Sequence, residues 1–212
     1  MPPVAPVVYV VDDDVSVREA LEMMIRAAGW QVRTFTSAEA FLSHPDIVAP
    51  SCLILDVRLR GASGLTLQQE ALREGIRLPI IFLTAHGDIT MSVQAMKAGA
   101  FDFLTKPFRD QPMLDTVIAA LRRDDGLRAQ ERLVAHIQSK YETLTPREKE
   151  VVALVVEGLM NKQIADRMGL SEVTVKIHRA QAMRKMEARS MPDLVRKLQR
   201  VVAQNQRASK AL

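Results

Sequence analysis

Carboxylate, hydroxyl and ammonium side chains stand at the ends of four short apolar runs in this 212-residue chain. Asp12 and Asp13 follow the run Val7–Val11, and Asp56 follows Cys52–Leu55. Thr84 follows Pro79–Leu83, and Lys106 lies two residues after Phe101–Leu104. Carboxylate oxygens are ligands that Mg²⁺ prefers. A carboxylate can also act as a nucleophile toward a phosphoryl donor, while a cation and an ammonium group neutralise the phosphoryl oxygens. These side-chain types therefore indicate a site for Mg²⁺ and a phosphoryl group, with Asp56 as the acceptor.

The elements that must position these side chains form a βα pattern. Five apolar runs predict short strands, and helix-like sequence separates each run from the next: Val7–Val11, Val32–Phe35, Cys52–Leu55, Pro79–Leu83 and Phe101–Leu104. Strands that alternate with helices predict a parallel sheet covered on both faces. Ligands bind such sheets outside the carboxyl ends of the strands, near the topological switch point. The pattern predicts one flavodoxin-like (βα)5 domain, and the chemistry lies at a single edge of its sheet.

Turn and cap residues predict the bounds of the helices. Ser16 and Glu19 match a capping box before a helix over 17–28, and Gly29 is placed to end that helix. Ser37 is placed to cap a second helix that ends at Leu42. Three further helices are predicted from the same signals over 65–74, 88–97 and 112–123.

Composition and charge limit the class of protein. The apolar share of 48% and the charged share of 25% are typical of globular domains. No apolar stretch has the length of a membrane span, and the first residues do not resemble a signal peptide. With one cysteine there is no disulfide framework. We expect a cytoplasmic protein with no membrane partner.

The net charge of +4 is unevenly distributed. Residues 1–123 carry 12 Lys and Arg against 14 Asp and Glu, a net of −2, whereas residues 143–212 carry 14 against 7, a net of +7. A basic C-terminal segment indicates a nucleic-acid partner. The predicted organisation is an N-terminal domain over 1–123, a helical linker over 124–142 and a second domain over 143–212.

The second domain is predicted to be all helical. Thr145 and Glu148 form a capping box with Pro146 at the first helical position, and a short turn over 169–171 joins two later helices. The four predicted helices cover 146–157, 162–168, 172–187 and 192–202. Two helices joined by so short a turn predict a helix-turn-helix.

The helix over 172–187 has the pattern of a DNA-reading helix. Val175, His178, Ala182 and Met186 recur at helical spacing and are predicted to face the core, so that Lys176, Arg179, Ala180 and Met183 point outward. Outward Lys and Arg near the start of a helix can contact guanine edges in the major groove, while other basic groups hold phosphates. A solvated basic helix without a ligand has the same pattern.

The first 120 or so residues resemble the receiver domain of two-component response regulators. Four stretches carry the resemblance: Val7–Asp14 (VVYVVDDD), Leu53–Asp56 (LILD), Phe82–Gly87 (FLTAHG) and Ala98–Phe108 (AGAFDFLTKPF). The resemblance implies that a sensor histidine kinase phosphorylates Asp56. It also implies that Asp12, Asp13, Asp56 and the backbone carbonyl of Arg58 hold Mg²⁺.

The same resemblance implies roles for further residues. Lys106 contacts the phosphoryl group, and the Lys106–Pro107 peptide is cis. Thr84 and Phe103 form a switch pair, in which Thr84 moves toward the phosphate and Phe103 rotates inward. Arg58 and His86 tune the dephosphorylation rate.

One departure from this resemblance lies in the loop after Asp56. Receivers of this type commonly have a proline there, whereas this chain has Arg60, Gly61, Ala62 and Ser63 before Gly64. Without the φ restriction of proline we expect a less rigid loop and an altered lifetime of the aspartyl phosphate.

Residues 144–189 resemble the LuxR/FixJ/NarL type of helix-turn-helix. Leu144–Ala165 (LTPREKEVVALVVEGLMNKQIA) and Ser171–Met186 (SEVTVKIHRAQAMRKM) carry this resemblance. It implies that Lys176 and Ile177 face bases and that Arg179 and Arg184 lie nearer the DNA backbone, with Ala180 where some relatives present a basic residue. It also implies dimerisation through the last helix, on a face formed by Leu194, Val195, Leu198, Val201 and Val202, and a roughly palindromic double-stranded promoter site.

The sequence thus predicts a DNA-binding transcriptional regulator that phosphorylation at Asp56 activates by driving homodimerisation. Beyond Mg²⁺-dependent phosphorylation and dephosphorylation of itself, no enzyme activity is expected, and RNA polymerase is a further candidate partner. Two alternatives remain. One is an Mg²⁺-dependent phosphatase with an aspartate nucleophile, which residues 12–15 fit poorly. The other is a binding module whose receiver is not phosphorylated.

Overall fold

A computed structural model of the chain describes residues 5–44, 47, 50–60, 62–85 and 89–209. The chain divides into two compact units, residues 1–128 and 129–212. Helix α5 (Asp110–Glu142) contributes its first part to one unit and its last part to the other. Residues 124–142, predicted as a helical linker, are helical throughout as part of α5.

The first unit is built on a parallel five-stranded sheet. Its strands are β1 (Val7–Val11), β2 (Gln31–Phe35), β3 (Ser51–Asp56), β6 (Ile80–Ala85) and β7 (Asp102–Lys106). Their order is β2-β1-β3-β6-β7, with every pair parallel. Each strand lies within two residues of its predicted run. The order is that of a flavodoxin-like fold, so the predicted fold class is confirmed.

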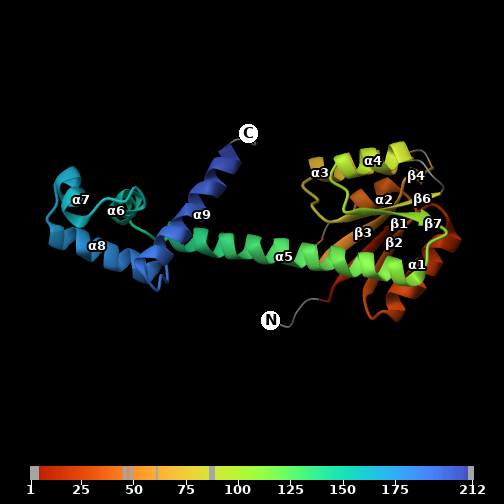
Figure 1. The fold of residues 1–212 in the computed structure, drawn as a ribbon, viewed down its shortest axis with the longest axis horizontal. Coiled ribbons are helices and arrows are strands. Elements are labelled where there is room, and N and C mark those ends of the chain that lie inside the picture. Colours follow the sequence, from red (N-terminus) through yellow and green to blue (C-terminus); the bar gives the residue numbers. More distant parts are fainter. Residues whose placement is uncertain (1–4, 45–46, 48–49, 61, 86–88, 210–212) are drawn as a thin grey trace. The chain divides into compact units, whose positions relative to one another are not determined.

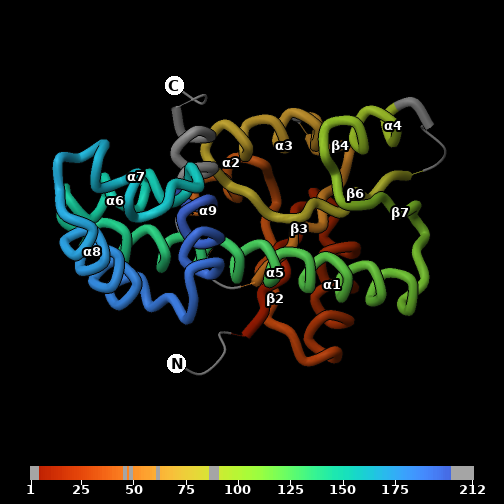
Figure 2. The backbone as a smooth tube through the Cα atoms, turned by 60° about the vertical axis from the view of Figure 1, so that its left-hand side comes forward, coloured from red at the N-terminus to blue at the C-terminus, as the bar shows by residue number. Residues whose placement is uncertain are grey.

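Helices cover both faces of this sheet (Figure 1; Figure 2). Helices α1 (Val15–Ala27) and α5 lie on one face, and α2 (Ala38–Leu42), α3 (Gly64–Arg73) and α4 (Ile89–Lys97) lie on the other. Alternate residues of each central strand therefore enter two separate cores. One core contains Val8, Val10, Leu21, Ile25, Ile54, Ile81, Met113 and Val117, and the other contains Tyr9, Phe41, Leu53, Leu55, Leu67, Phe82 and Ala95.

Helix α1 begins earlier than predicted. Its N-cap is Asp14, whose Oδ1 accepts a hydrogen bond from the backbone N–H of Ser16 at 2.8 Å. The predicted capping box of Ser16 and Glu19 is therefore wrong, because an Asp two residues earlier already satisfies a free N–H of the first turn. The helix ends as predicted before Gly29, which has φ +87°.

A short hairpin follows β3. Strands β4 (Arg58–Leu59) and β5 (Ala62–Ser63) pair antiparallel, so Arg58 faces Ser63 across the ladder. Two-residue strands leave no hydrophobic period in a sequence, and this hairpin was not predicted. It carries the chain from the phosphoacceptor candidate to the start of α3.

The second unit is helical, as predicted. It contains α6 (Pro146–Val156), α7 (Asn161–Met168), α8 (Glu172–Lys185) and α9 (Met191–Ser209). The capping box of Thr145 and Glu148 is present with Pro146 in the first turn. Gly169, with φ +65°, ends α7 and begins the short turn into α8, which gives the predicted helix-turn-helix.

The last turns of α5 belong to the core of this second unit. Ile137 is buried with Val152, Ala182 and Met186, and Tyr141 packs against the same cluster. These contacts fix the C-terminal part of α5 against α6 and α8. Among the described residues, no helix has the length and apolar character needed to span a lipid bilayer.

Candidate functional site

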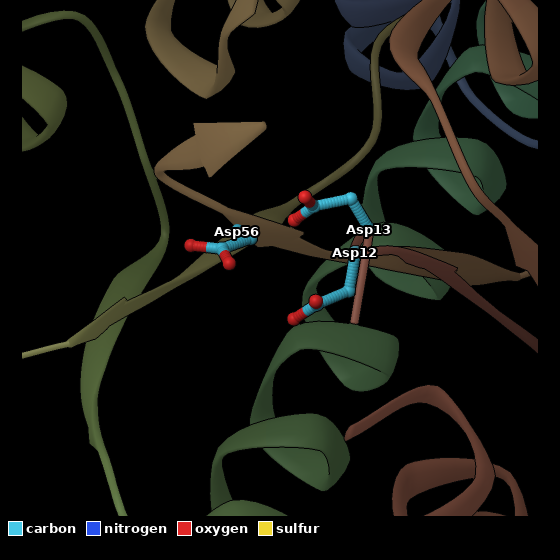
Figure 3. A group of neighbouring side chains, drawn as sticks. All are labelled: Asp12, Asp13 and Asp56. Carbon is cyan, nitrogen blue, oxygen red and sulfur yellow. The ribbon is translucent and has the colours of Figure 1, made fainter. Parts of the chain in front are cut away.

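The switch point of the sheet lies between β1 and β3, because the chain turns from β1 to β2 on one side and returns to β3 on the other. Asp12 directly follows β1, and Asp56 is the last residue of β3. Figure 3 shows Asp12 and Asp13 at the end of β1 with Asp56 beside them. One ligand oxygen from each of the three lies within 4.8 Å of the others. The sheet therefore gathers the predicted carboxylates at one edge.

Lys106, at the end of β7, reaches into this cluster. Its Nζ donates hydrogen bonds to Asp12 Oδ2 at 2.7 Å and to Asp56 Oδ2 at 2.8 Å. Burial alone would lower the pKa of the Lys106 ammonium, but these bonds outweigh burial and raise the pKa. Burial raises the pKa of the fully buried Asp12, and the bonds from Lys106 and from the N–H of Asp14 oppose that rise. The ammonium is thus held charged between two carboxylates.

Asp56 is held in place by its neighbours. Its Oδ1 accepts a hydrogen bond from the backbone N–H of Arg58 at 3.1 Å, and its side chain is 12% exposed. Gly64 lies against the same residue, since a Cβ added to Gly64 would stand 2.4 Å from the carbonyl oxygen of Asp56. A glycine is required where two backbone segments approach this closely. The carboxylate is oriented yet reachable from solvent.

Asp13 is the most exposed member of the cluster, with 22% of its side chain accessible. Its Oδ2 lies 2.9 Å from Nε of Arg60, which comes from the turn between β4 and β5. Three carboxylates with converging oxygens form a hard donor set that suits Mg²⁺, which takes one or two carboxylates directly and keeps several waters. The residues present therefore fit the predicted metal.

The predicted switch pair lies on neighbouring strands. Thr84 of β6 pairs with Thr105 of β7, and Phe103 lies two residues earlier on β7, so all three side chains share one face of the sheet. Thr84 is 6% exposed and Phe103 is 39% exposed. The exposed side chain of Arg58 lies on β4, and His86 lies outside the described residues.

Helix α8 presents an exposed face in the second unit. Lys176, Ile177, Ala180 and Arg184 are exposed, and Val175, Ala182 and Met186 are buried as predicted. Arg179 is half-buried, and its guanidinium contacts the side-chain oxygen of Asn161 at the start of α7. The basic residues that the sequence assigned to DNA thus lie on the solvent side of the helix or at its margin.

Met183, which was predicted to point outward, and Lys185 both make contacts within the second unit. Met183 packs partly buried against the core instead of pointing outward, because the C-terminal half of α8 is also covered by α5 and α9. Lys185 donates to Glu148 Oε2 at 2.7 Å, and the same carboxylate oxygen accepts the N–H of Thr145 at 2.8 Å. Lys185 therefore ties α8 to the cap of α6.

The apolar residues of α9 mostly enter the core of their own unit. Leu194, Leu198 and Val201 are 0%, 3% and 2% exposed, and Val195 packs against a second cluster with Ile164 and Val175. The side chain of Val202 lies outside the described part of the chain. A dimer through α9 would therefore have to use the faces of the helix that these residues leave free.

Sequence reasoning missed three contacts of these sites, although Arg60 and Gly64 were both noted in the loop after Asp56. The contact of Asn161 with Arg179 depends on the packing of α7 on α8, and the contact of Arg60 with Asp13 depends on the β4–β5 hairpin. The contact of Gly64 could have been found, because a glycine directly before a predicted helix and close behind a candidate nucleophile is a signal of close backbone approach.

Comparison with known proteins identifies both units. Residues 8–118 match the family model of the response regulator receiver domain, and residues 142–198 match that of bacterial regulatory proteins of the luxR family. The chain belongs to the response regulators. Within that family its relatives are of the FixJ and NodW type, with a receiver domain followed by a LuxR-type DNA-binding domain.

Several relatives match almost the whole response regulator. Nodulation protein W of Bradyrhizobium diazoefficiens is 54% identical over 192 residues, covering 90% of this chain and 84% of that protein. Transcriptional regulatory protein FixJ of Azorhizobium caulinodans is 41% identical, covering 89% and 90%. The solved structure of response regulator StyR has a TM-score of 0.83 at 44% identity and covers 92% of this chain and 99% of that one.

These relatives are transcriptional regulators of two-component systems, and the predicted function class is confirmed. They argue against the alternative of a phosphatase. A histidine kinase and DNA are the partners that a receiver and a LuxR-type domain imply.

Proposed function

We propose that Asp56 is the phosphoacceptor of this response regulator and that its phosphorylation switches the LuxR-type domain to promoter binding. The observation that carries the proposal is the position of the Asp56 carboxylate. It lies at the switch point of the sheet, oriented by the N–H of Arg58 and bonded to Lys106 at 2.8 Å, with two further carboxylates beside it.

Asp12, Asp13, Asp56 and the backbone carbonyl of Arg58 are the proposed ligands of Mg²⁺. Oxygens of the three carboxylates lie within 4.8 Å of one another, which supports a shared cation. When bound, the metal supplies positive charge that offsets the repulsion between a carboxylate nucleophile and an anionic phosphoryl donor. The protein supplies the remaining positive charge through Lys106.

In the transfer step one oxygen of Asp56 attacks phosphorus. The new bond is an acyl phosphate P–O bond, and the bond that breaks is the P–N bond of a phosphohistidine on the kinase, whose nitrogen keeps the electron pair. With acetyl phosphate as donor, the P–O bond breaks and acetate leaves. Lys106 stays charged and donates to the transferred group, because its ammonium already lies at hydrogen-bonding distance from Asp56.

The added phosphoryl group carries roughly −1.5 to −2 charges at neutral pH. We propose that the Thr84 hydroxyl then donates to it and that Phe103 turns inward behind Thr84 on the shared face of the sheet. The exposure of Phe103, at 39%, supports a side chain with room to move. Arg58 and His86 are proposed to set the lifetime of the phosphate.

The proposed output begins on α4, β7 and the receiver part of α5. Val93, Met96 and Phe103 expose 46%, 43% and 39% of their surface there, which supports a homodimer that forms after phosphorylation. Two copies of α8 would then read a roughly palindromic site, with Lys176 and Ile177 near bases and Arg179, Ala180 and Arg184 nearer the backbone. RNA polymerase is a further proposed partner.

Intact mass spectrometry tests the phosphoacceptor assignment. The protein is incubated with acetyl phosphate with and without Mg²⁺, as wild type, Asp56→Asn and the control Asp115→Asn, which removes an exposed carboxylate on α5. We expect one added phosphoryl group in wild type and Asp115→Asn with Mg²⁺ and none in Asp56→Asn. An adduct that survives Asp56→Asn would contradict the assignment. A folded wild type without any adduct would favour a receiver that is not phosphorylated.

A further inference from the structure

Arg60 places a guanidinium group on one of the three carboxylates. Its Nε lies 2.9 Å from Asp13 Oδ2, so the two groups form an ion pair. Arg60 reaches Asp13 from the turn between β4 and β5, whose strands pair Arg58 with Ser63 and Leu59 with Ala62. The hairpin therefore places the positive charge of Arg60, a residue of the loop after Asp56, beside Asp13 at the end of β1.

Lys106 and Arg60, which both contact carboxylates of the cluster, have different surroundings. Lys106 is 17% exposed and is shared between Asp12 and Asp56, whereas the side chain of Arg60 is 89% exposed. An exposed ion pair is weak and is screened by salt. Arg60 can therefore leave Asp13 at small cost, whereas Lys106 is fixed by two bonds.

A guanidinium and a metal ion cannot use the same carboxylate oxygen equally well at the same time. Mg²⁺ requires oxygen ligands at about 2.0–2.1 Å in near-octahedral geometry. The Arg60 guanidinium stands beside Asp13 Oδ2, with its Nε at 2.9 Å, and its positive charge repels an approaching cation.

We propose that Arg60 competes with Mg²⁺ for Asp13 and thereby sets the metal affinity of the phosphoacceptor site. The inference rests on the proposed function, because the metal is the one that this site would bind. Arg60 acts as a positioning residue: it holds the Asp13 carboxylate in the metal-free protein and releases it when Mg²⁺ binds.

Isothermal titration of the full chain with MgCl₂ tests the competition in a double-mutant cycle. The four proteins are wild type, Arg60→Ala, Asp13→Asn and the double variant. The expected strength of an exposed ion pair corresponds to a Kd for Mg²⁺ that is about two- to five-fold lower in Arg60→Ala than in wild type. In the Asp13→Asn background the Arg60 substitution is expected to leave the Kd unchanged.

Arg26→Ala is the matched control. Arg26 forms an exposed ion pair with Glu22 on α1, at 2.7 Å, and its loss removes the same charge without contact to the carboxylate cluster. We expect wild-type Mg²⁺ affinity in this variant. A second measurement follows the Arg Nε–H signals of ¹⁵N-labelled protein by NMR: the Arg60 signal moves as Mg²⁺ is added and saturates at the same Kd, while the Arg26 signal stays constant.

Each other outcome has a distinct meaning. Equal affinity in wild type and Arg60→Ala, or an Arg60 signal that ignores Mg²⁺, overturns the inference and leaves the proposed function standing. If Arg60→Ala lowers the Kd for Mg²⁺ equally in the wild-type and Asp13→Asn backgrounds, the effect is one of general charge, and the competition for Asp13 is overturned. Absence of Mg²⁺ binding in all four proteins overturns the metal site of the proposed function itself.

Discussion

The carboxylate edge of the receiver and the exposed face of α8 carry their functional groups in opposite ways. At the edge, Asp12, Asp56 and Lys106 are mostly buried and bonded to one another. On α8, Lys176 and Ile177 project into solvent. Chemistry on a small group requires preorganised charges in a protected place, whereas DNA recognition requires side chains that can reach a large external partner.

This difference predicts how each region responds to substitution. At the edge, a single added or lost atom disturbs packed backbone and paired charges. On α8, a substitution removes one contact from a set that acts together, so its effects are graded and depend on salt.

Gly64→Ala should have the largest effect on stability. The new Cβ would lie 2.4 Å from the carbonyl oxygen of Asp56 and 3.1 Å from Phe82, so the backbone must shift. Overpacking of this kind destabilises by about 1–3 kcal/mol, and thermal unfolding measures the loss. Gly126→Ala is the control, since its Cβ meets nothing within 4 Å in α5, and we expect that change to stabilise by about 0.5–1 kcal/mol. A Gly64→Ala protein as stable as wild type would contradict the close approach of the Gly64 backbone to Asp56.

Glu148→Gln should have a somewhat smaller effect, in the second unit. Glu148 is 2% exposed and accepts hydrogen bonds from Lys185 and from the N–H of Thr145. The substitution leaves the Lys185 ammonium without its carboxylate partner, so it should lower the free energy of unfolding by about 1–2 kcal/mol. Chemical denaturation at neutral pH measures this change. Glu150→Gln, at an exposed pair with Arg147, should change the stability by less than about 0.5 kcal/mol.

The Glu148 pair also predicts a pH dependence. Burial would raise the pKa of Glu148, but the hydrogen bonds and charge of Lys185 and the N–H of Thr145 outweigh it and hold the pKa below its ordinary value of 4.5. The unfolded chain then binds the proton more tightly, so the contribution to stability is present above that value and is lost as the pH falls below it. The difference in unfolding free energy between wild type and Glu148→Gln should shrink in acid. A difference that stays constant from pH 7 to acid would contradict this account of the pair.

Lys176→Ala should weaken DNA binding by about 1–3 kcal/mol if Lys176 reads a base edge, and it should relax the preference at that base pair. The protein itself should unfold as wild type does, because Lys176 is exposed. Fluorescence anisotropy with a selected site and its single-base variants measures both effects. Equal losses on every sequence would assign Lys176 to the DNA backbone instead.

Arg184→Ala should have the smallest effect. Arg184 is exposed near the end of α8, where a phosphate contact would weaken binding uniformly across sequences and reduce the salt slope by about one ion. The measurement is binding affinity over a range of salt concentrations. A change in sequence preference would show that Arg184 contacts bases.

The contrast also explains how much could be predicted from sequence. Strand ends are visible because an apolar run stops at a charge, and in a parallel sheet those ends meet at one edge whatever the loops do. Asp12, Asp56 and Lys106 were predicted in this way. The Arg60 contact was not, because it depends on a hairpin of two-residue strands.

In the second unit, helical spacing predicted which residues of α8 are buried, but it did not predict which elements cover the rest of the helix. Val175, Ala182 and Met186 were predicted as core from their spacing, whereas Met183 was misassigned because α5 and α9 also cover the end of α8. Leu194 and Leu198, interpreted as a dimer face, lie in the core of the second unit, in one cluster with residues of α5, α6 and α8. A helical period shows that a face is apolar, but it does not show which partner covers that face.

DNA binding with and without phosphorylation tests whether the phosphoryl group on Asp56 switches the LuxR-type domain to promoter binding. A labelled duplex, selected from random sequence by the phosphorylated protein, is titrated with wild type and Asp56→Asn before and after treatment with acetyl phosphate and Mg²⁺. We expect the treatment to tighten wild-type binding by about 5- to 150-fold and to leave the binding of Asp56→Asn unchanged. Equal affinity of treated and untreated wild type, with the phosphoryl adduct confirmed by mass, would contradict this expectation.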